Sequence, residues 1–132
     1  MQDDLKLAVE RWLLKAKNDL RTAETMLSID DPITDTASFH AHQCAEKCLK
    51  AFLTSIGVHV ERTHDLPRLV EICSREDSDF ESLRSSALTL ADYAVASRYP
   101  DDWREILIEE AKQALKEAKK VLKFVKGKIN LR

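Results

Sequence analysis

The segment Phe39-His40-Ala41-His42-Gln43-Cys44-Ala45-Glu46-Lys47-Cys48-Leu49-Lys50-Ala51-Phe52-Leu53 carries the clearest helical pattern in this chain of 132 residues. Its apolar side chains recur three or four positions apart, as on the buried face of a helix. They are Ala41, Ala45, Cys48, Leu49, Phe52 and, just beyond the segment, Ile56. His42, Glu46 and Lys50 form a polar row along the edge of that face, and Lys47 lies just outside it.

This polar row has two interpretations. Glu46 and Lys50 are an i,i+4 pair in the favourable order, which stabilises an exposed helix by roughly 0.2–0.5 kcal/mol. The segment is then an amphipathic helix with a solvated ion pair. Alternatively, polar side chains so close to the buried face line a cleft. The spacing alone leaves both interpretations open.

The composition indicates one globular all-α domain over residues 1–132. A chain of this length buries roughly 68 % of its unfolded surface on folding. Hydrophobic residues make up 44 % and charged residues 33 %, while two Gly and three Pro leave little turn chemistry for hairpins. The net charge of −2 gives no overall positive field, so binding to nucleic acid requires a local basic patch.

The sequence offers no evidence for a membrane segment, a disulfide framework or a cofactor. No apolar run is as long as the ~18 residues of a membrane span, so a cytoplasmic location is expected. The three cysteines are odd in number, and Cys44 and Cys48 lie one helical turn apart, so reduced thiols are expected. His40, Cys44 and Cys48 could in principle hold a metal, but buried cysteines usually behave as small apolar residues. We therefore expect no metal site and no cofactor.

Helical periodicity, and the breaks between periodic segments, predict five helices. Pro32 interrupts the pattern after the first helix, Gly57 suits the residue that follows a helix, and Asp65 suits an N-cap. Pro100 disfavours helical backbone at the residue before it, so the fourth helix should end near Ser97. The first expected helix runs from Asp3 to about Ser28, and the second from a cap at Asp35 or Thr36 to Gly57. The third runs from Leu66 to Cys73, and the fourth from a cap at Ser78 or Asp79 to near Ser97. The last is capped by Asp101 and Asp102 and runs from Trp103 to about Lys126. This pattern predicts an antiparallel up-and-down bundle of four long helices plus one short helix.

Four short motifs follow one another along nearly the whole chain. They are Trp12 with Ala16-Lys17-Asn18-Asp19-Leu20-Arg21-Thr22-Ala23, then Gln43-Cys44-Ala45-Glu46-Lys47-Cys48-Leu49-Lys50-Ala51, His64-Asp65-Leu66 and Arg98-Tyr99-Pro100. In this order they resemble the motifs of the HEPN family (higher eukaryote and prokaryote nucleotide-binding domains). The second motif resembles the family's recurring Gln-x-x-Glu-Lys-x-x-Lys-Ala.

The resemblance implies a prokaryotic helical bundle that is commonly a homodimer. Such small HEPN proteins are often encoded beside a minimal nucleotidyltransferase, as a two-component pair of toxin–antitoxin type. Many HEPN proteins are also metal-independent ribonucleases, in which an Arg is followed four to six residues later by a His near the start of the last helix.

This sequence departs from the ribonuclease pattern because no His follows Arg98. Cleaving RNA without a metal requires a group that exchanges protons near neutral pH, usually His. Arg stays protonated and is a poor base. We therefore favour a protein without the usual ribonuclease motif, which acts as the nucleotide- or RNA-associated partner of a nucleotidyltransferase. The alternative is a metal-independent ribonuclease toxin that uses a non-standard histidine such as His64 or His42.

The expected nucleotide or RNA site lies where the second helix meets the bend at Arg98. Its candidate residues are Glu46, Lys47, Lys50, His64, Arg98 and Tyr99. Arg98 could grip a phosphate or pair with a nearby acid, and Tyr99 could stack on a base or pack in the core. His64 could reach a ligand or help to cap the third helix. The lysines late in the last helix form either a solvated face or a contact with nucleic acid.

Overall fold

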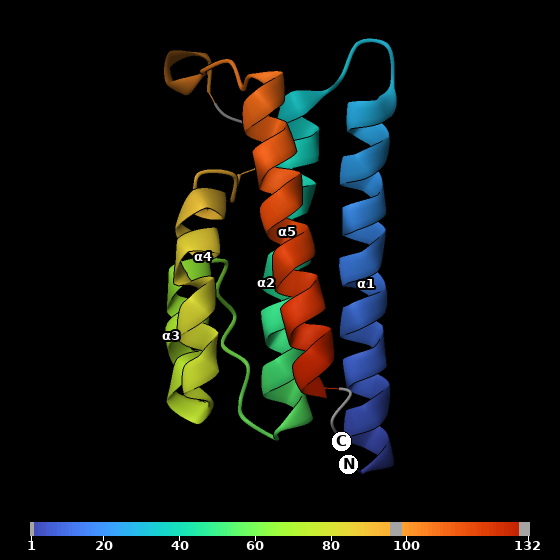
Figure 1. Ribbon diagram of the computed structural model, residues 1–132, viewed down its shortest axis with the longest axis vertical. Helices are drawn as coiled ribbons and strands as arrows, with labels where there is room; N and C mark the ends of the chain where they lie inside the picture. Colours follow the sequence, from blue (N-terminus) through green and yellow to red (C-terminus); the bar gives the residue numbers. More distant parts are fainter. Residues whose placement is uncertain (1, 96–98, 130–132) are drawn as a thin grey trace.

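The fold is an all-α bundle, as the sequence predicts. A computed structural model describes residues 2–95 and 99–129. The three long helices α1 (Asp3–Ser28), α2 (Thr34–Ser55) and α5 (Ile108–Ile129) lie side by side (Figure 1). Helices α2 and α5 run in the same direction and α1 runs in the opposite one, so the long helices do not alternate as the up-and-down arrangement requires. Two shorter helices, α3 (Leu66–Glu76) and α4 (Arg84–Ala91), pack on one side of this layer. The described residues contain no β-strand.

The second helix is the centre of the core. It contacts α1, α3, α4 and α5. The apolar positions of α2 that the sequence predicts to be buried are buried, except that Ile56 is only partly buried. The polar row is buried as well, because His42, Glu46 and Lys50 are at most 6 % exposed. The interpretation as a solvated ion pair is therefore wrong, since α2 is covered on several sides instead of one.

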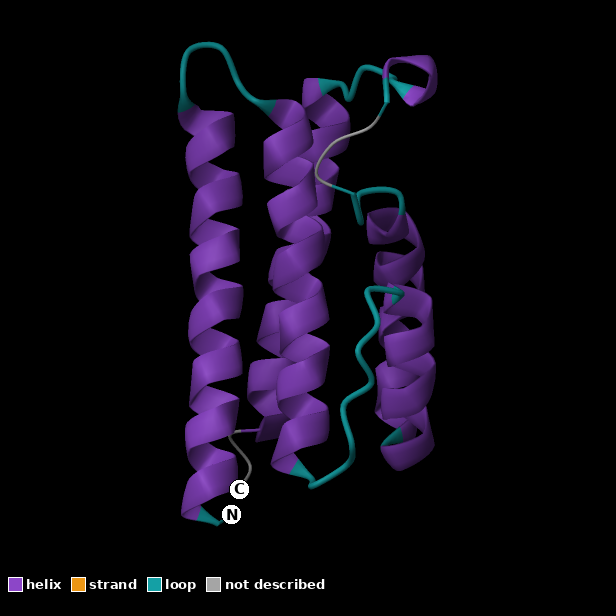
Figure 2. Ribbon diagram, turned by 180° about the vertical axis from the view of Figure 1, so that it is seen from behind, coloured by secondary structure: helices purple, strands orange, loops and turns teal. Residues whose placement is uncertain are grey.

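The expected ends of α1, the end of α2 and the start of α3 are confirmed, whereas α2 begins at Thr34 without a side-chain cap from Asp35 or Thr36, and α3 continues to Glu76. The first helix has the expected bounds, and Gly57 adopts a left-handed backbone with φ of 74° just after α2. The Asp65 carboxylate accepts the backbone N–H of Arg68 at 3.2 Å, which caps α3. Figure 2 shows the connection 56–65 running between the layer of long helices and the pair α3 and α4.

The fourth helix is much shorter than expected. Asp77 accepts the backbone N–H of Asp79 at 3.0 Å and starts the 3₁₀ helix η1 (Ser78–Leu83), which precedes the eight-residue α4. After α4 the N–H of Tyr93 bonds to the carbonyl of Leu90 in a tightened turn, so the helix stops. Over the described residues the bundle thus has three long and two short α-helices, not four long and one short. Ala96, Ser97 and Arg98 lie outside the described residues.

The last helix begins at Ile108, five residues later than expected. Asp101 and Asp102 belong to a separate 3₁₀ turn, η2 (Pro100–Asp102), and Trp103 after it is extended (φ −74°, ψ 139°). The extended segment 103–107 is held because Arg104 reaches forward to Glu110 in the first turn of α5. No helix in the described ranges is both long and apolar enough to cross a lipid bilayer.

Candidate functional site

Three of the predicted site residues form one contact network, which we call the Glu46 cluster. Glu46 accepts Lys50 Nζ at 3.0 Å through Oε2 and contacts His64 Nδ1 at 2.8 Å through Oε1. The side chains of Glu46 and Lys50 are only 4 % and 7 % exposed, whereas that of His64 is 72 % exposed. The connection 56–65 therefore brings His64 to α2 and leaves it at the protein surface.

A second network, the Asp19 cluster, joins the first two helices. Asp19 of α1 accepts Lys47 Nζ through Oδ2 and contacts His40 Nδ1 at 2.8 Å through Oδ1. The Asp19 side chain is buried, and its two partners are partly exposed. Lys47, which the sequence suggested as a ligand-binding cation, is thus bound to a carboxylate of this chain.

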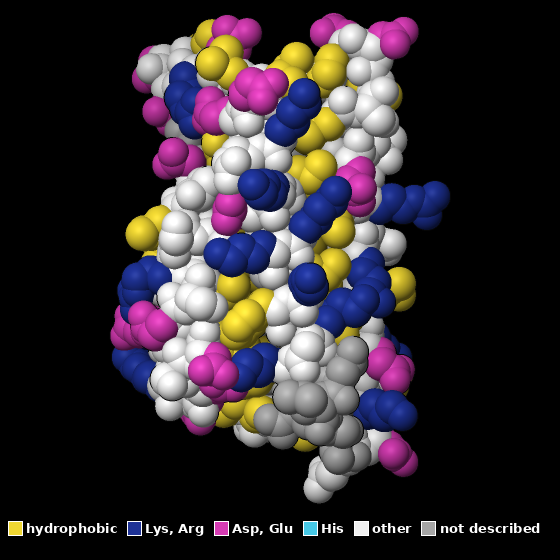
Figure 3. All heavy atoms as spheres, in the orientation of Figure 1, with side chains coloured by type: hydrophobic (Ala, Val, Ile, Leu, Met, Phe, Trp, Pro, Cys, Tyr) yellow, Lys and Arg dark blue, Asp and Glu magenta, His cyan; other side chains and the backbone are white. Residues whose placement is uncertain are grey.

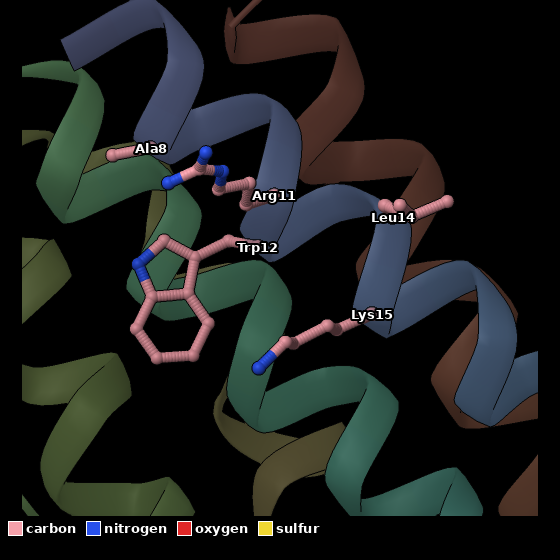
Figure 4. Close-up of a pocket in the computed structure, with 5 residues that line it drawn as sticks. All are labelled: Ala8, Arg11, Trp12, Leu14 and Lys15. Atoms are coloured by element: carbon pink, nitrogen blue, oxygen red, sulfur yellow. The ribbon is translucent and has the colours of Figure 1, made fainter. Parts of the chain in front are cut away.

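Trp12 covers the Glu46 cluster from α1. Lys50 Nζ lies 5.8 Å from the centre of the Trp12 ring, within the range of a cation–π contact. A shallow hollow of about 310 Å³ beside the ring is lined by Ala8, Arg11, Trp12, Leu14 and Lys15. In Figure 4, Trp12 and Lys15 extend from α1 across α2, and Leu14 points away from them. The hollow is therefore a surface feature beside the indole ring, and Glu46 does not line it.

Burial gives the Glu46 cluster a structural role. Taking two ions out of water is costly, and removing one partner of a buried pair typically costs about 3–5 kcal/mol because the other is left uncompensated. The contacts of Lys50 with the Glu46 carboxylate and the Trp12 ring offset the cost of burying its charge. A lysine held in this way is not free to hold a phosphate.

His64 is the member of the cluster that could act chemically. Its Nδ1 faces Glu46, and when Nδ1 carries the proton, Nε2 is free to accept one. A carboxylate that orients an exposed imidazole in this way is typical of general acid–base sites. His42 differs, because it is fully buried and burial lowers its pKa below the usual value. Its Nε2 has no hydrogen-bond partner in the part of the chain that the structure describes.

The structure does not bring Tyr99 to this network. The Tyr99 side chain is 81 % exposed, so it does not pack in the core. The segment after it, Trp103 to Ile106, lines a hollow with residues Asp31 to Asp35, at the start of α2. Lys50 lies about 22 Å further along α2 at 1.5 Å per residue. Arg98 lies outside the described residues, so its role remains a prediction.

Sequence reasoning missed a network at the start of the last helix, which we call the Glu110 cluster. Glu110 accepts both Arg104 guanidinium nitrogens, at 2.7 and 3.0 Å, and the Tyr93 hydroxyl at 2.6 Å. The bond from Arg104 lowers the pKa of Glu110 to about 2, and burial together with the bond to Glu110 raises that of Tyr93 to about 12. No spacing rule links an Arg ahead of a helix to a Glu six residues later, so no local pattern in the sequence pointed to this network.

Asp19 was also missed, although the sequence contained a clue. It occupies a core position of α1, three residues after Ala16 and four before Ala23, both of which are fully buried. A carboxylate at such a position needs a buried partner. Within the described residues, no group of three or more His, Cys, Asp or Glu side chains is arranged to hold a metal ion.

The fold is that of a small all-α domain in which Asp19 of α1 contacts His40 and Lys47 of α2. A family model of the HEPN domain matches residues 9–128, so the chain belongs to the HEPN family. The chain is similar to ST0689, an archaeal HEPN homologue, with a TM-score of 0.73 and 29 % identity over 92 % of this chain and 97 % of that one. It is similar also to TT1696 from Thermus thermophilus, with a TM-score of 0.79 and 33 % identity over 91 % and 97 %. No protein with a curated description matches the chain.

Proposed function

We propose that this HEPN protein is an interaction module, the nucleotide- or RNA-associated partner of a minimal nucleotidyltransferase in a pair of toxin–antitoxin type. The observation that carries the proposal is that the two candidate lysines of α2 are already bound to carboxylates of the chain. Lys50 is paired with Glu46 and Lys47 with Asp19, so neither is free to stabilise a phosphate during cleavage. The absence of a His after Arg98 supports the same conclusion.

An exposed apolar surface supports a role in binding a protein. Large hydrophobic side chains from α4 to the start of α5 are exposed to solvent. They are Leu88, Val95, Tyr99, Trp103, Leu107 and Ile108. Exposed aromatic and aliphatic side chains are typical of protein interfaces. We name this set the apolar end of the bundle.

Co-expression with the protein encoded by the adjacent gene tests the proposal. We expect that protein to be a small nucleotidyltransferase and to co-elute with the HEPN chain in size-exclusion chromatography. Trp103→Ser should weaken the complex at least tenfold, because buried aromatic anchors carry much of the binding energy of an interface. Leu14→Ser, an equally exposed apolar position on α1, is the matched control. An unrelated neighbour, or a neighbour that never co-elutes, would contradict the proposal.

We also propose that the chain forms a twofold homodimer, as the family commonly does. Light scattering at micromolar concentration should give twice the chain mass of 15.1 kDa. Trp103→Ser should keep this mass if the apolar end binds the nucleotidyltransferase. Loss of the homodimer in that variant would assign the apolar end to self-association, and a wild-type mass of one chain would refute the dimer.

A ribonuclease acting through His64 is the second candidate function, favoured by the contact between His64 and buried Glu46. The test is cleavage of a labelled RNA in the presence of a chelator. Asn can keep the donor toward Glu46 but cannot exchange protons, so His64→Asn separates chemistry from folding. Cleavage by wild type that disappears in His64→Asn would establish this function and refute the non-cleaving module. No cleavage by wild type is the result that we expect.

A further inference from the structure

The outer face of the last helix is strongly basic although the chain as a whole is slightly acidic. Seven lysines of α5 are exposed or partly exposed, and Lys112 and Lys128 among them pair with acids. We call the other five the lysine ridge: Lys116, Lys119, Lys120, Lys123 and Lys126. After Glu117, α5 contains no acidic residue up to its end at Ile129. Figure 3 shows Lys and Arg side chains gathered over α5 and the adjoining side of α1. The net charge of −2 therefore conceals a local positive surface.

Few acids neutralise this ridge. Lys119 pairs with Glu24 of α1 at 3.5 Å, where both side chains are about half exposed. The nearest acid of α5, Glu117, bonds instead to Ser86 and Gln113. No ion pair within the described residues reaches Lys120 or Lys123. Lysines three and four residues apart repel one another, and the helix dipole favours cations only in the last turn, so folding alone does not explain the ridge.

Two hollows flank the ridge. One, of about 440 Å³, lies at the seam of α1 and α5 over Leu20 and Leu122. The other, of about 430 Å³, lies on the opposite side over Phe124. Lys123 and Gly127 border both hollows, so they form the divide between them.

Gly127 has no packing reason to be glycine. A Cβ atom added there would meet no described atom within 4 Å, so alanine would fit. Glycine inside a helix costs about 1 kcal/mol relative to alanine. A bare backbone at an exposed divide does, however, let a ligand approach closely from either hollow.

We propose that the lysine ridge binds the phosphate backbone of single-stranded RNA without sequence preference. Successive lysines project at steps of about one helical turn, 5.4 Å, which suits a polymer with one charge in each repeating unit. The hollows over Leu20, Leu122 and Phe124 offer apolar surface to unpaired bases on both sides of the backbone. In a base-paired duplex the faces of the bases are stacked on one another, so they could not contact the hollows. The inference rests on the proposed association with RNA and assigns it a surface separate from the Glu46 cluster.

The test is fluorescence anisotropy with a labelled oligouridine of about 12 nucleotides, within the site sizes of strand-binding grooves. Lys120→Gln/Lys123→Gln should weaken binding at least tenfold and lower the salt slope by about 1.4, since each single-strand phosphate contributes about 0.7. The matched control is Arg75→Gln/Arg84→Gln, which removes the same charge from exposed positions on α3 and α4. The control should bind within twofold of wild type.

A second variant tests the hollows without changing the charge. Gly127→Leu adds a side chain at the divide and favours the helix, so the fold should be kept. We expect it to weaken oligouridine binding several-fold. If Gly127→Leu bound oligouridine with wild-type affinity, the bases would not occupy the hollows, and the assignment to single-stranded RNA would be wrong.

Three further results would overturn the proposal. The first is that the wild-type protein does not bind oligouridine at low salt. The second is that the arginine control weakens binding as much as Lys120→Gln/Lys123→Gln does. The third is that polyglutamate displaces the RNA at equal charge concentration, which would indicate that the ligand of the ridge is an acidic protein. Co-elution of Lys120→Gln/Lys123→Gln with the nucleotidyltransferase is measured in parallel. Retained co-elution with lost RNA binding supports the ridge, whereas lost co-elution overturns a separate role for it. Retained RNA binding in the variant overturns the ridge and leaves the proposed function standing.

Discussion

The Glu46 cluster and the Glu110 cluster are built alike but lie in very different surroundings. Each consists of a glutamate that binds one long cation and one further polar side chain. Glu46 and Lys50 are almost completely buried, whereas the Glu110 and Arg104 side chains are 30 % and 44 % exposed. The same chemistry should therefore be essential to folding in one region and nearly dispensable in the other, because water can replace a lost partner only at the surface.

Removing one buried ion should have the largest effect on stability. Lys50→Met keeps the length of the side chain but leaves Glu46 charged with only His64 as a partner. We expect a loss of about 3–5 kcal/mol in the free energy of unfolding, measured by urea denaturation. A loss below about 1 kcal/mol would mean that the pair is effectively solvated, and the contrast between the two clusters would disappear.

Replacing both buried ions should restore much of that loss. In Glu46→Met/Lys50→Met no charge is left uncompensated, so the double variant should be more stable than Lys50→Met by about 2 kcal/mol or more. Glu46→Met alone completes the double-mutant cycle. Additive losses in the two single variants would show that Glu46 and Lys50 act independently.

Removing the exposed ion should have a smaller effect. Arg104→Met should cost at most about 1 kcal/mol near neutral pH, since exposed ion pairs contribute little. Because the pKa of Glu110 is lowered to about 2, this cluster stabilises the fold above pH 4.5 and loses its contribution as the pH falls from there toward 2. Acid titrations followed by circular dichroism should therefore show a smaller loss over that range in Arg104→Met. Identical acid profiles in both proteins would contradict the role of Arg104.

The smallest effect should come from His42, as a pH dependence in a different range. Burial lowers its pKa, so below about pH 6.5 the unfolded chain binds a proton that the folded protein does not. Stability should therefore fall as the pH drops from about 7.5 to 5.5. His42→Leu should reduce this fall in melting temperature, and His59→Gln at an exposed position should preserve it. If the melting temperature of His42→Leu fell as much as that of wild type, other groups would cause the pH dependence.

The sequence predicted what local patterns determine. Helical periodicity gave the bounds of α1 and the buried apolar face of α2, and local caps placed Asp65 and Gly57 correctly. It did not predict that Lys50 is buried, because this depends on how Trp12 and α5 cover α2. Periodicity describes one helix at a time, whereas burial depends on its neighbours.

The errors at α4 and α5 have a related cause. Asp101 and Asp102 have the chemistry of caps, but they lie within the 3₁₀ turn η2, and α5 begins only at Ile108, after Arg104 has bonded forward to Glu110. For the candidate site, the sequence pointed to Glu46, Lys47, Lys50 and His64, which the structure places in two networks. The pair of Glu46 and Lys50 was one of the two interpretations of the polar row, whereas the bond from Lys47 to Asp19 of another helix was not predicted.

The position of α2, in contact with four other helices, has a consequence for how the protein opens. A helix that is covered from several directions cannot detach while the rest of the fold remains in place. The backbone amides of α2 should thus exchange with deuterium only when the entire bundle unfolds, whereas those of the short helix α4 can exchange through local opening. The protein should behave as a cooperative unit assembled around one helix.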